Sequence, residues 1–100
     1  MLVVKFTDPQ LQQHVERNAA CIIGVPDEQR PICGLLDAYY CFGLLEGDQS
    51  PRVAEAIQLL LSPELRPALR AWYHRFGDDM NANAIAVRER LGELAGERFG

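Results

Sequence analysis

Residues 32–45, ICGLLDAYYCFGLL, decide the fold of this chain of 100 residues, and Asp37 is the only charged residue among them. The stretch is too short to span a bilayer and too apolar to lie at a surface, so we expect it to be buried. As a helix over residues 32–46, it carries large apolar side chains on one face and small ones on the opposite face. The large ones are Ile32, Leu35, Leu36, Tyr39 and Phe42, and the small ones are Gly34, Ala38 and Cys41. A helix with two packing faces is a central helix, and a second helix can come close to its small side chains.

The composition indicates one folded domain over residues 1–100, large enough for a core without disulfides or metal. Apolar residues make up 48% of the chain, which is typical of a globular protein. Nine arginines stand against one lysine, a bias typical of GC-rich bacterial or phage coding sequences. The fold class that we predict is mostly α: a small helical bundle of about five helices with one or two short N-terminal β-strands.

Charge and cysteine content argue against several classes of function. A net charge of −4 and a pI near 5.0 disfavour a binder of nucleic acid or anionic membrane, because phosphate neutralisation needs surplus Lys and Arg. Residues 1–10, MLVVKFTDPQ, lack the apolar run of a signal peptide, and we expect no membrane span. Three cysteines without CxxC spacing indicate reduced thiols rather than a disulfide framework. We therefore expect a cytoplasmic protein without a cofactor.

Ahead of the central helix, the sequence predicts one helix between two short apolar runs. Residues 2–6, LVVKF, predict a strand. Thr7 or Asp8 can then accept hydrogen bonds from the first N–H groups of a helix that begins at Pro9 and runs to about residue 18. Residues 21–25, CIIGV, fit a second strand and a plain linker equally well.

Residues 50–61 and 62–73 form a near-repeat, in which each copy opens with Ser-Pro and continues as an amphipathic helix. The copies align without a gap, so that apolar positions of the first match those of the second, as in the pair Leu61/Tyr73. A proline at position 67 cannot donate to a preceding turn. The second helix therefore has either a loose first turn or a true start near Arg66.

A last helix is predicted from about residue 79 to residue 95, and residues 96–100 are expected to fray. The helix carries a heptad-like apolar seam, which suits packing within the bundle and packing against a second copy of the chain equally well. The seam consists of Ala84, Val87, Leu91 and Leu94.

The first constellation that could carry chemistry is Cys33, Asp37 and Cys41, which share one side of the central helix at i, i+4 and i+8. Two thiols and a carboxylate can bind a soft metal ion. The spacing is not that of a metal motif, however, and no histidine stands beside them in the sequence. A nearby acid also raises the pKa of a thiol, which argues against a reactive thiolate. We therefore favour cysteines that fill the core, with a metal site as the weaker alternative.

The second constellation is a polar face on the later helix of the near-repeat. Its members are Arg66, Arg70, Tyr73 and His74, which fall within roughly 100° of one another around a helix. Two guanidinium groups and an aromatic ring can bind a carboxylate, a phosphate or an acidic protein surface. The alternative is an ordinary solvated face whose arginines pair with local acids such as Glu64. The other histidine, His14, is expected to be exposed on the first helix and not catalytic.

The sequence shows no catalytic constellation and so favours a non-catalytic protein-interaction module. This would be a small bacterial or phage regulator, adaptor, chaperone or inhibitor that binds a protein partner. Two segments, the 80–95 helix and the 2–6 strand, allow a homodimer. The alternative is a ligand- or metal-binding helical domain or small enzyme, with a central pocket lined by Tyr39, Cys41, Phe42 and Trp72. Sequence-specific DNA binding is weaker still, because Glu64 would lie against phosphate at the start of a recognition helix.

Overall fold

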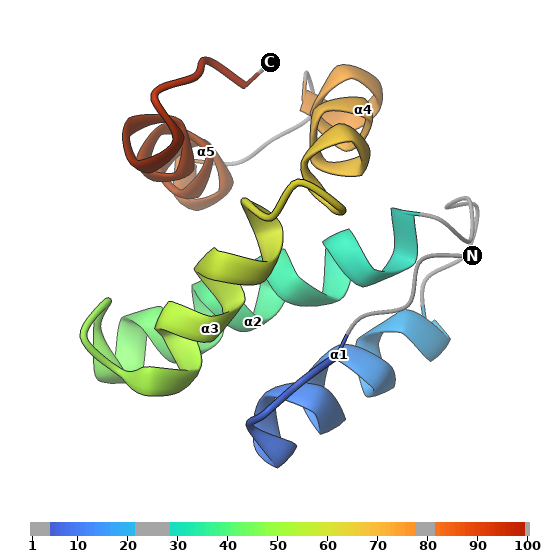
Figure 1. Ribbon diagram of the computed structural model, residues 1–100, viewed down its shortest axis with the longest axis vertical. Coiled ribbons are helices and arrows are strands. Elements are labelled where there is room, and N and C mark those ends of the chain that lie inside the picture. Colours follow the sequence, from blue (N-terminus) through green and yellow to red (C-terminus); the bar gives the residue numbers. More distant parts are fainter. Residues whose placement is uncertain (1–4, 22–28, 78–81, 100) are drawn as a thin grey trace.

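The computed structural model describes residues 5–21, 29–77 and 82–99, and most of these residues belong to five helices (Figure 1). The helices are α1 (Pro9–Cys21), α2 (Arg30–Glu46), α3 (Pro51–Leu60), α4 (Arg66–Phe76) and α5 (Ala82–Ala95). They form a compact all-α globule with extents of 30 × 27 × 25 Å. The prediction of about five helices is confirmed. Among the described residues, no helix combines the length and the apolar character needed to cross a membrane.

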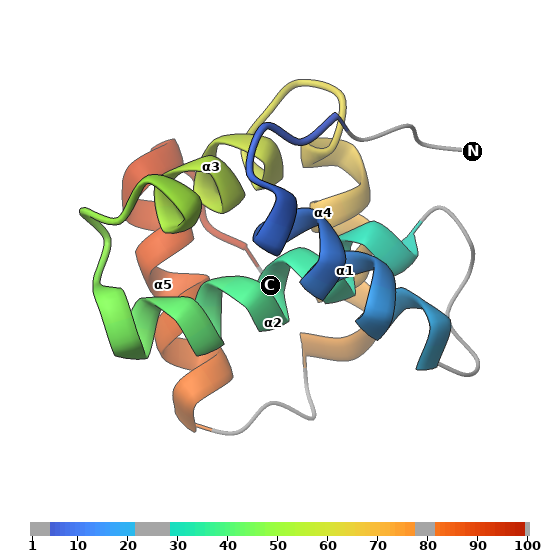
Figure 2. The same ribbon diagram turned by 90° about the horizontal axis from the view of Figure 1, so that it is seen from below.

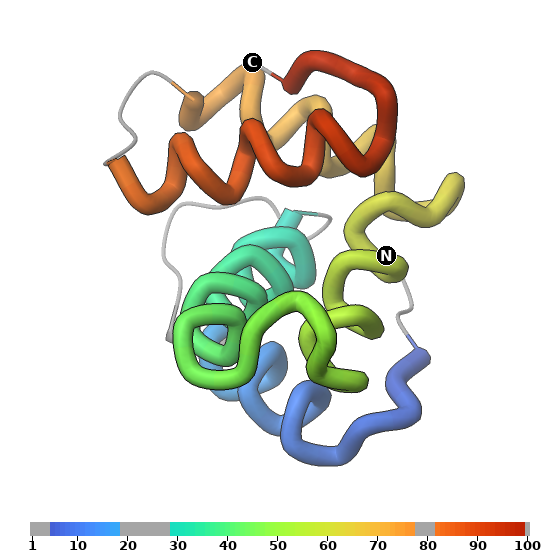
Figure 3. The backbone as a smooth tube through the Cα atoms, turned by 90° about the vertical axis from the view of Figure 1, so that its left-hand side faces the viewer, coloured from blue at the N-terminus to red at the C-terminus, as the bar shows by residue number. Residues whose placement is uncertain are grey.

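Helix α2 is the central helix, because it contacts each of the other four. α1 lies on one side of it and α4 and α5 lie on the other, as Figures 1 and 3 show. Its large side chains face the core as predicted: Ile32 and Leu35 are fully buried and Tyr39 is nearly so. Leu36 and Phe42 are half-buried and pack against the same core.

Helix α1 runs antiparallel to α2 (Figure 2), and Val15 of α1 packs on Gly34, one of the small residues of α2. A Cβ atom on Gly34 would lie 2.8 Å from Val15 Cγ1 and 3.0 Å from Val15 Cα, so a glycine is needed for this approach. Asp8 caps the helix, because its Oδ1 accepts from two backbone N–H groups of the first turn, at 2.9 and 3.0 Å. Leu11 and Val15 are buried on one face of α1. The predicted first helix is confirmed.

The predicted N-terminal strands are not found in the described part of the chain. Of residues 2–6, only the last two are described, and both are irregular. The backbone after them bonds to a side chain rather than to a neighbouring strand: the N–H groups of Thr7 and Asp8 donate to the carboxylate of Glu55 at 3.1 and 3.2 Å. The stretch 21–25, which fits a strand and a linker equally well, begins at the last residue of α1, and the rest of it lies outside the described residues.

The two copies of the near-repeat begin their helices at different points. α3 begins at Pro51, as the Ser-Pro start predicts. α4 begins at Arg66, the later of its two predicted starts. The residues before it form a turn, in which the Ser62 hydroxyl accepts from the N–H of Leu65 at 3.3 Å and the Ser62 carbonyl accepts from the N–H of Arg66 at 2.8 Å. Ser62 therefore satisfies the first N–H groups of this segment from outside α4.

The segment after α5 packs against the bundle, contrary to the expectation that it frays. Gly96 turns the chain with a φ of 64°, and the N–H of Glu97 donates to the Gly92 carbonyl at 3.0 Å. Phe99 then enters the core, with its ring centroid 5.8 Å from that of Tyr73. A short irregular segment has no periodic pattern, so its one buried aromatic residue escapes a search for periodicity.

The predicted seam of α5 is only partly buried. Leu91 is fully buried, Ala84 and Val87 are half-buried, and Leu94 is 45% exposed. Each helix contributes to a single hydrophobic core. The core consists of Leu11, Val15, Ile32, Leu35, Ala38, Tyr39, Val53, Ala56, Leu60, Leu65, Leu69, Tyr73, Leu91 and Phe99.

Candidate functional site

A cluster of three possible metal ligands lies where α1 crosses α2, and it consists of His14, Asp37 and Cys41. His14 Nε2 lies 2.7 Å from Asp37 Oδ2, and Cys41 Sγ lies 3.8 Å from the same oxygen. One ligand atom from each residue lies within 4.8 Å of the other two. The side chains of His14 and Asp37 are 23% and 44% exposed, so solvent reaches the cluster.

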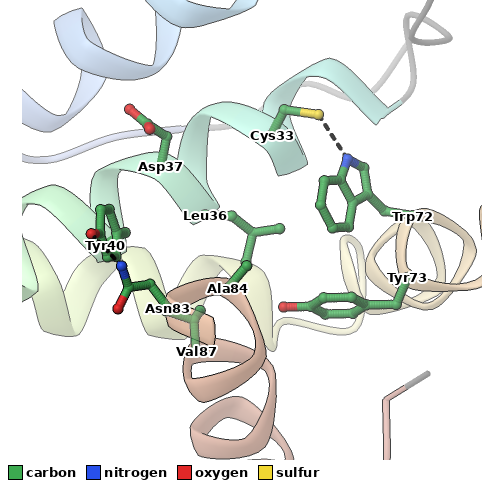
Figure 4. A pocket seen from close by; sticks show the side chains of 9 residues that line it. All are labelled: Cys33, Leu36, Asp37, Tyr40, Trp72, Tyr73, Asn83, Ala84 and Val87. Atoms are coloured by element: carbon green, nitrogen blue, oxygen red, sulfur yellow. Dashed lines mark hydrogen bonds between the residues drawn. The ribbon is translucent and has the colours of Figure 1, made fainter. Parts of the chain in front are cut away.

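Helix α2 supplies two members of this cluster from one of its sides. Asp37 and Cys41 are one helical turn apart, so their side chains lie one above the other. Figure 4 shows Asp37 in the lining of a cavity that also includes Val87 of α5. The distance of 2.7 Å from its Oδ2 to His14 Nε2 brings the same carboxylate to α1.

Helix α1 supplies the third member, His14, which precedes the residue that packs on Gly34. The imidazole ring is tilted against the ring of Phe42, with centroids 5.1 Å apart. One turn further along α1, Asn18 Nδ2 donates to the His14 carbonyl at 2.8 Å. The crossing of the two helices therefore determines that the imidazole meets the Asp37 carboxylate.

The order of the three groups argues against a cysteine nucleophile. In enzymes that use one, a base such as imidazole lies beside the thiol and takes its proton. Here the Asp37 carboxylate lies between His14 and the Cys41 thiol. Burial and this carboxylate both raise the pKa of Cys41, which favours the thiol over the thiolate.

The structure separates Cys33 from the other two ligands that the sequence grouped with it. Trp72 Nε1 donates to Cys33 Sγ at 2.7 Å (Figure 4). Burial raises the pKa of the Cys33 thiol, and the indole hydrogen bond opposes this to a smaller extent. The group that joins Asp37 and Cys41 is instead His14, which we expected to be exposed and not catalytic. The His14–Asp37 pair spans 23 positions, so no local spacing reveals it.

A cavity of about 320 Å³ lies between α2, α4 and α5, with apolar side chains such as Leu36 and Val87 in its lining. The buried Tyr73 hydroxyl points into it and has no hydrogen-bond partner among the described residues (Figure 4). Burial raises the pKa of this phenol. Of the four residues predicted to line a central pocket, Trp72 alone lines this cavity.

The predicted partner-binding face of α4 is not continuous. Tyr73 is 1% exposed and belongs to the core, so a partner cannot reach it, contrary to our expectation. Arg66 donates through Nε and Nη2 to a carbonyl of the preceding turn, at 3.2 and 2.8 Å. Arg70 is exposed and forms an ion pair with Glu97, and its hydrogen bond lowers the pKa of that carboxyl group. His74 is exposed.

The end of α2 is apolar and exposed, contrary to the predicted burial of the whole stretch 32–45. Leu44 is 72% exposed and Leu45 is 83% exposed. Beside Leu44, a hollow of about 170 Å³ lies between α2 and α5, and Tyr40 and Ala86 are part of its lining. We name Leu44, Leu45 and this hollow the leucine surface.

Comparison with known proteins finds no relative. The chain matches no model of a protein family, no curated protein sequence and no solved structure. Its function must be inferred from its own residues.

Proposed function

We propose that this protein is a non-catalytic protein-interaction module, such as a small regulator, adaptor, chaperone or inhibitor, that binds a protein partner in the cytoplasm. The leucine surface is the observation that supports this proposal, because Leu44 and Leu45 are both largely exposed. Single exposed apolar side chains are common on protein surfaces. Two adjacent leucines beside an apolar hollow are a larger patch, of the kind that marks interaction sites.

The surroundings of the leucine surface have the character of an interface centre with a polar rim. Tyr40 and Ala86 extend the apolar surface into the hollow beside Leu44. Asp48 and Arg90 border it as an ion pair with an N–O distance of 3.1 Å. Interfaces combine an apolar centre with a polar rim, and burial of apolar area contributes roughly 25 cal/mol per Å². A protein that inserts an apolar side chain between α2 and α5 would fit this surface.

The test of this proposal is a comparative affinity capture from a lysate of the organism that produces the protein. The baits are the unaltered chain, the double variant Leu44→Asp/Leu45→Asp, and the control Gln58→Asp at an exposed position of α3. We expect one stoichiometric partner on the unaltered and control baits, and a loss of about tenfold or more on the leucine variant. Circular dichroism checks that the variants remain helical. Retention of the partner by the leucine variant would overturn the assignment to this surface.

Two further measurements test whether the partner binds at the face of α4 and whether the partner is a second copy of the chain. An Arg70→Glu bait tests the exposed remainder of the predicted face of α4, and loss of the partner on this bait alone would transfer the site there. Light scattering coupled to size-exclusion chromatography tests for a second copy of the chain. A dimer that the leucine variant converts to monomer would identify that copy as the partner. A dimer that survives in the leucine variant would favour the predicted pairing through the 80–95 helix or the 2–6 strand.

A further inference from the structure

The cluster of His14, Asp37 and Cys41 brings one nitrogen, one oxygen and one sulfur ligand to a single point between α1 and α2. Zn²⁺ accepts all three types of ligand, whereas Mg²⁺ and Ca²⁺ prefer oxygen ligands alone. The ion displaces the proton of the Cys41 thiol into solvent when it binds, so that a carboxylate and a thiolate together balance its two charges. We propose that these three side chains form a Zn²⁺ site, which is separate from the leucine surface and does not depend on it.

Two of the three distances within the cluster are close to those that this ion requires, and all three ligand atoms lie within 4.8 Å of one another. Zinc holds nitrogen and oxygen at about 2.0–2.2 Å and sulfur at about 2.3 Å in a tetrahedron, which separates neighbouring ligand atoms by about 3.3–3.6 Å. The distance of 3.8 Å from Cys41 Sγ to Asp37 Oδ2 is already close to this range. The His14–Asp37 pair, at 2.7 Å, has to open by less than about 1 Å, which is within reach of a side-chain rotation.

The two helices hold the ligands in place without the ion. Two ligands are fixed by their spacing of one turn along α2, and the third is fixed by the packing of α1. Val15 is in close contact with Gly34, and this contact limits sliding of His14 along α2. The ring of Phe42 limits rotation of the imidazole. Ligands on rigid helices are positioned more accurately than ligands on loops, which favours binding.

Three protein ligands leave one tetrahedral position for water or for a further ligand. Within the described residues, the ligand group has these three members. Zinc sites with three protein ligands keep the fourth position open, whereas structural sites use four. Because the side chains of His14 and Asp37 are partly exposed, the open position would be accessible from solvent.

The test is a titration of the purified full chain, freed of metal by a chelator, with Zn²⁺ by calorimetry and with Co²⁺ by absorption spectroscopy. We expect one equivalent to bind, and the Co²⁺ form to show a thiolate-to-cobalt charge-transfer band. His14→Ala and Cys41→Ser should each weaken Zn²⁺ binding by about tenfold or more, and Cys41→Ser should also remove the band. Asp37→Asn, which keeps the shape of the side chain, should weaken binding as well.

The chain offers matched controls for the sulfur and nitrogen ligands. Cys33→Ser and His74→Ala should retain the affinity and the charge-transfer band of the unaltered protein, since neither residue belongs to the cluster. The proposal is overturned if the unaltered chain binds no Zn²⁺, or if His14→Ala and Cys41→Ser, still helical by circular dichroism, bind it as tightly. It is also overturned if Cys33→Ser removes the band. The leucine double variant should bind Zn²⁺ normally, so the two proposals can fail separately.

Discussion

At the scale of single residues, the sequence predicts the environment of a side chain well when one helix determines it. The prediction is poorer when the environment depends on how two helices pack. Gly34 belongs to a stripe of small side chains, and a second helix packs there as expected. His14 and Asp37 stand on different helices, so their contact depends on the crossing angle of α1 and α2, which one sequence does not specify. Two patterns involve Tyr73: the near-repeat aligns it with apolar Leu61, whereas the helical face that it shares with Arg70 and His74 is polar. The structure follows the apolar alignment.

The close contact at Gly34 gives the first prediction. Gly34→Ala would place a Cβ atom 2.8 Å from Val15 Cγ1 and 3.0 Å from Val15 Cα, and the second of these atoms is backbone that cannot rotate away. The two helices must separate, so we expect the free energy of unfolding to fall by about 1–3 kcal/mol, measured by urea denaturation.

The control for this substitution is Gly77→Ala. A Cβ atom at Gly77 would meet only a side-chain atom of Arg88 at 3.6 Å, an ordinary contact, and the backbone there is helical. We expect no loss of stability in this variant, because alanine restricts the unfolded chain more than glycine does. An equal loss in both variants would show that the packing of α1 on α2 is not the cause.

At the scale of secondary-structure elements, the periodicity of apolar residues predicts the helices. It does not predict the structure of the segments that connect or follow them. The start of α1 follows from Asp8 and a proline, and the start of α3 from Ser-Pro, because these signals act within a few residues. The N-terminal apolar run resembles a strand, and the described backbone just after it, at Thr7 and Asp8, bonds to Glu55 of α3. The segment after α5 has no period, so only the structure reveals that Phe99 anchors it.

The anchoring of the C-terminal segment gives the second prediction. Phe99 is 5% exposed and its ring lies beside the buried ring of Tyr73. Phe99→Ala should therefore lower the free energy of unfolding by about 3 kcal/mol, the lower end of the range for such truncations, because a terminal segment can relax. Arg98→Ala, at the exposed neighbouring position, should change it by less than about 0.5 kcal/mol. Equal denaturation midpoints for Phe99→Ala and the unaltered chain would contradict the described packing.

At the scale of the whole molecule, the relative lengths of the helices decide which apolar residues remain exposed. α2 has 17 residues, whereas α1 has 13 and α3 has 10, so α2 is longer than either neighbour. Leu44 and Leu45 lie on its last turn and are exposed although the stretch that contains them is the most apolar of the chain. Hydrophobicity predicts the central helix correctly, but it does not show where the neighbouring helices end. For this reason the leucine surface could not be inferred from the sequence.

The molecule also depends on ion pairs between distant segments, and the pair of Arg70 with Glu97 joins α4 to the C-terminal segment. The hydrogen bond from Arg70 lowers the pKa of the Glu97 carboxyl group from its ordinary value of 4.5. A carboxyl group whose pKa is lower in the folded chain stabilises the fold above its unfolded pKa, and the contribution disappears as the pH falls through the folded pKa. The stability of the whole chain should therefore respond to this one group in acid.

Glu97→Gln gives the third prediction, which is a difference in melting temperature that depends on pH. At pH 7 the variant should melt at a lower temperature than the unaltered chain, because the ion pair is lost. Below the folded pKa of Glu97 the two curves should meet, since the carboxyl group is then protonated in both states of the unaltered chain. The difference should also shrink at high salt, because Arg70 is exposed and Glu97 is partly exposed. Glu64→Gln, an exposed position on the turn before α4, is the control and should show a smaller difference at pH 7. A deficit in Glu97→Gln that stays constant down to strongly acid pH would mean that Glu97 stabilises the C-terminal segment by packing rather than by its charge.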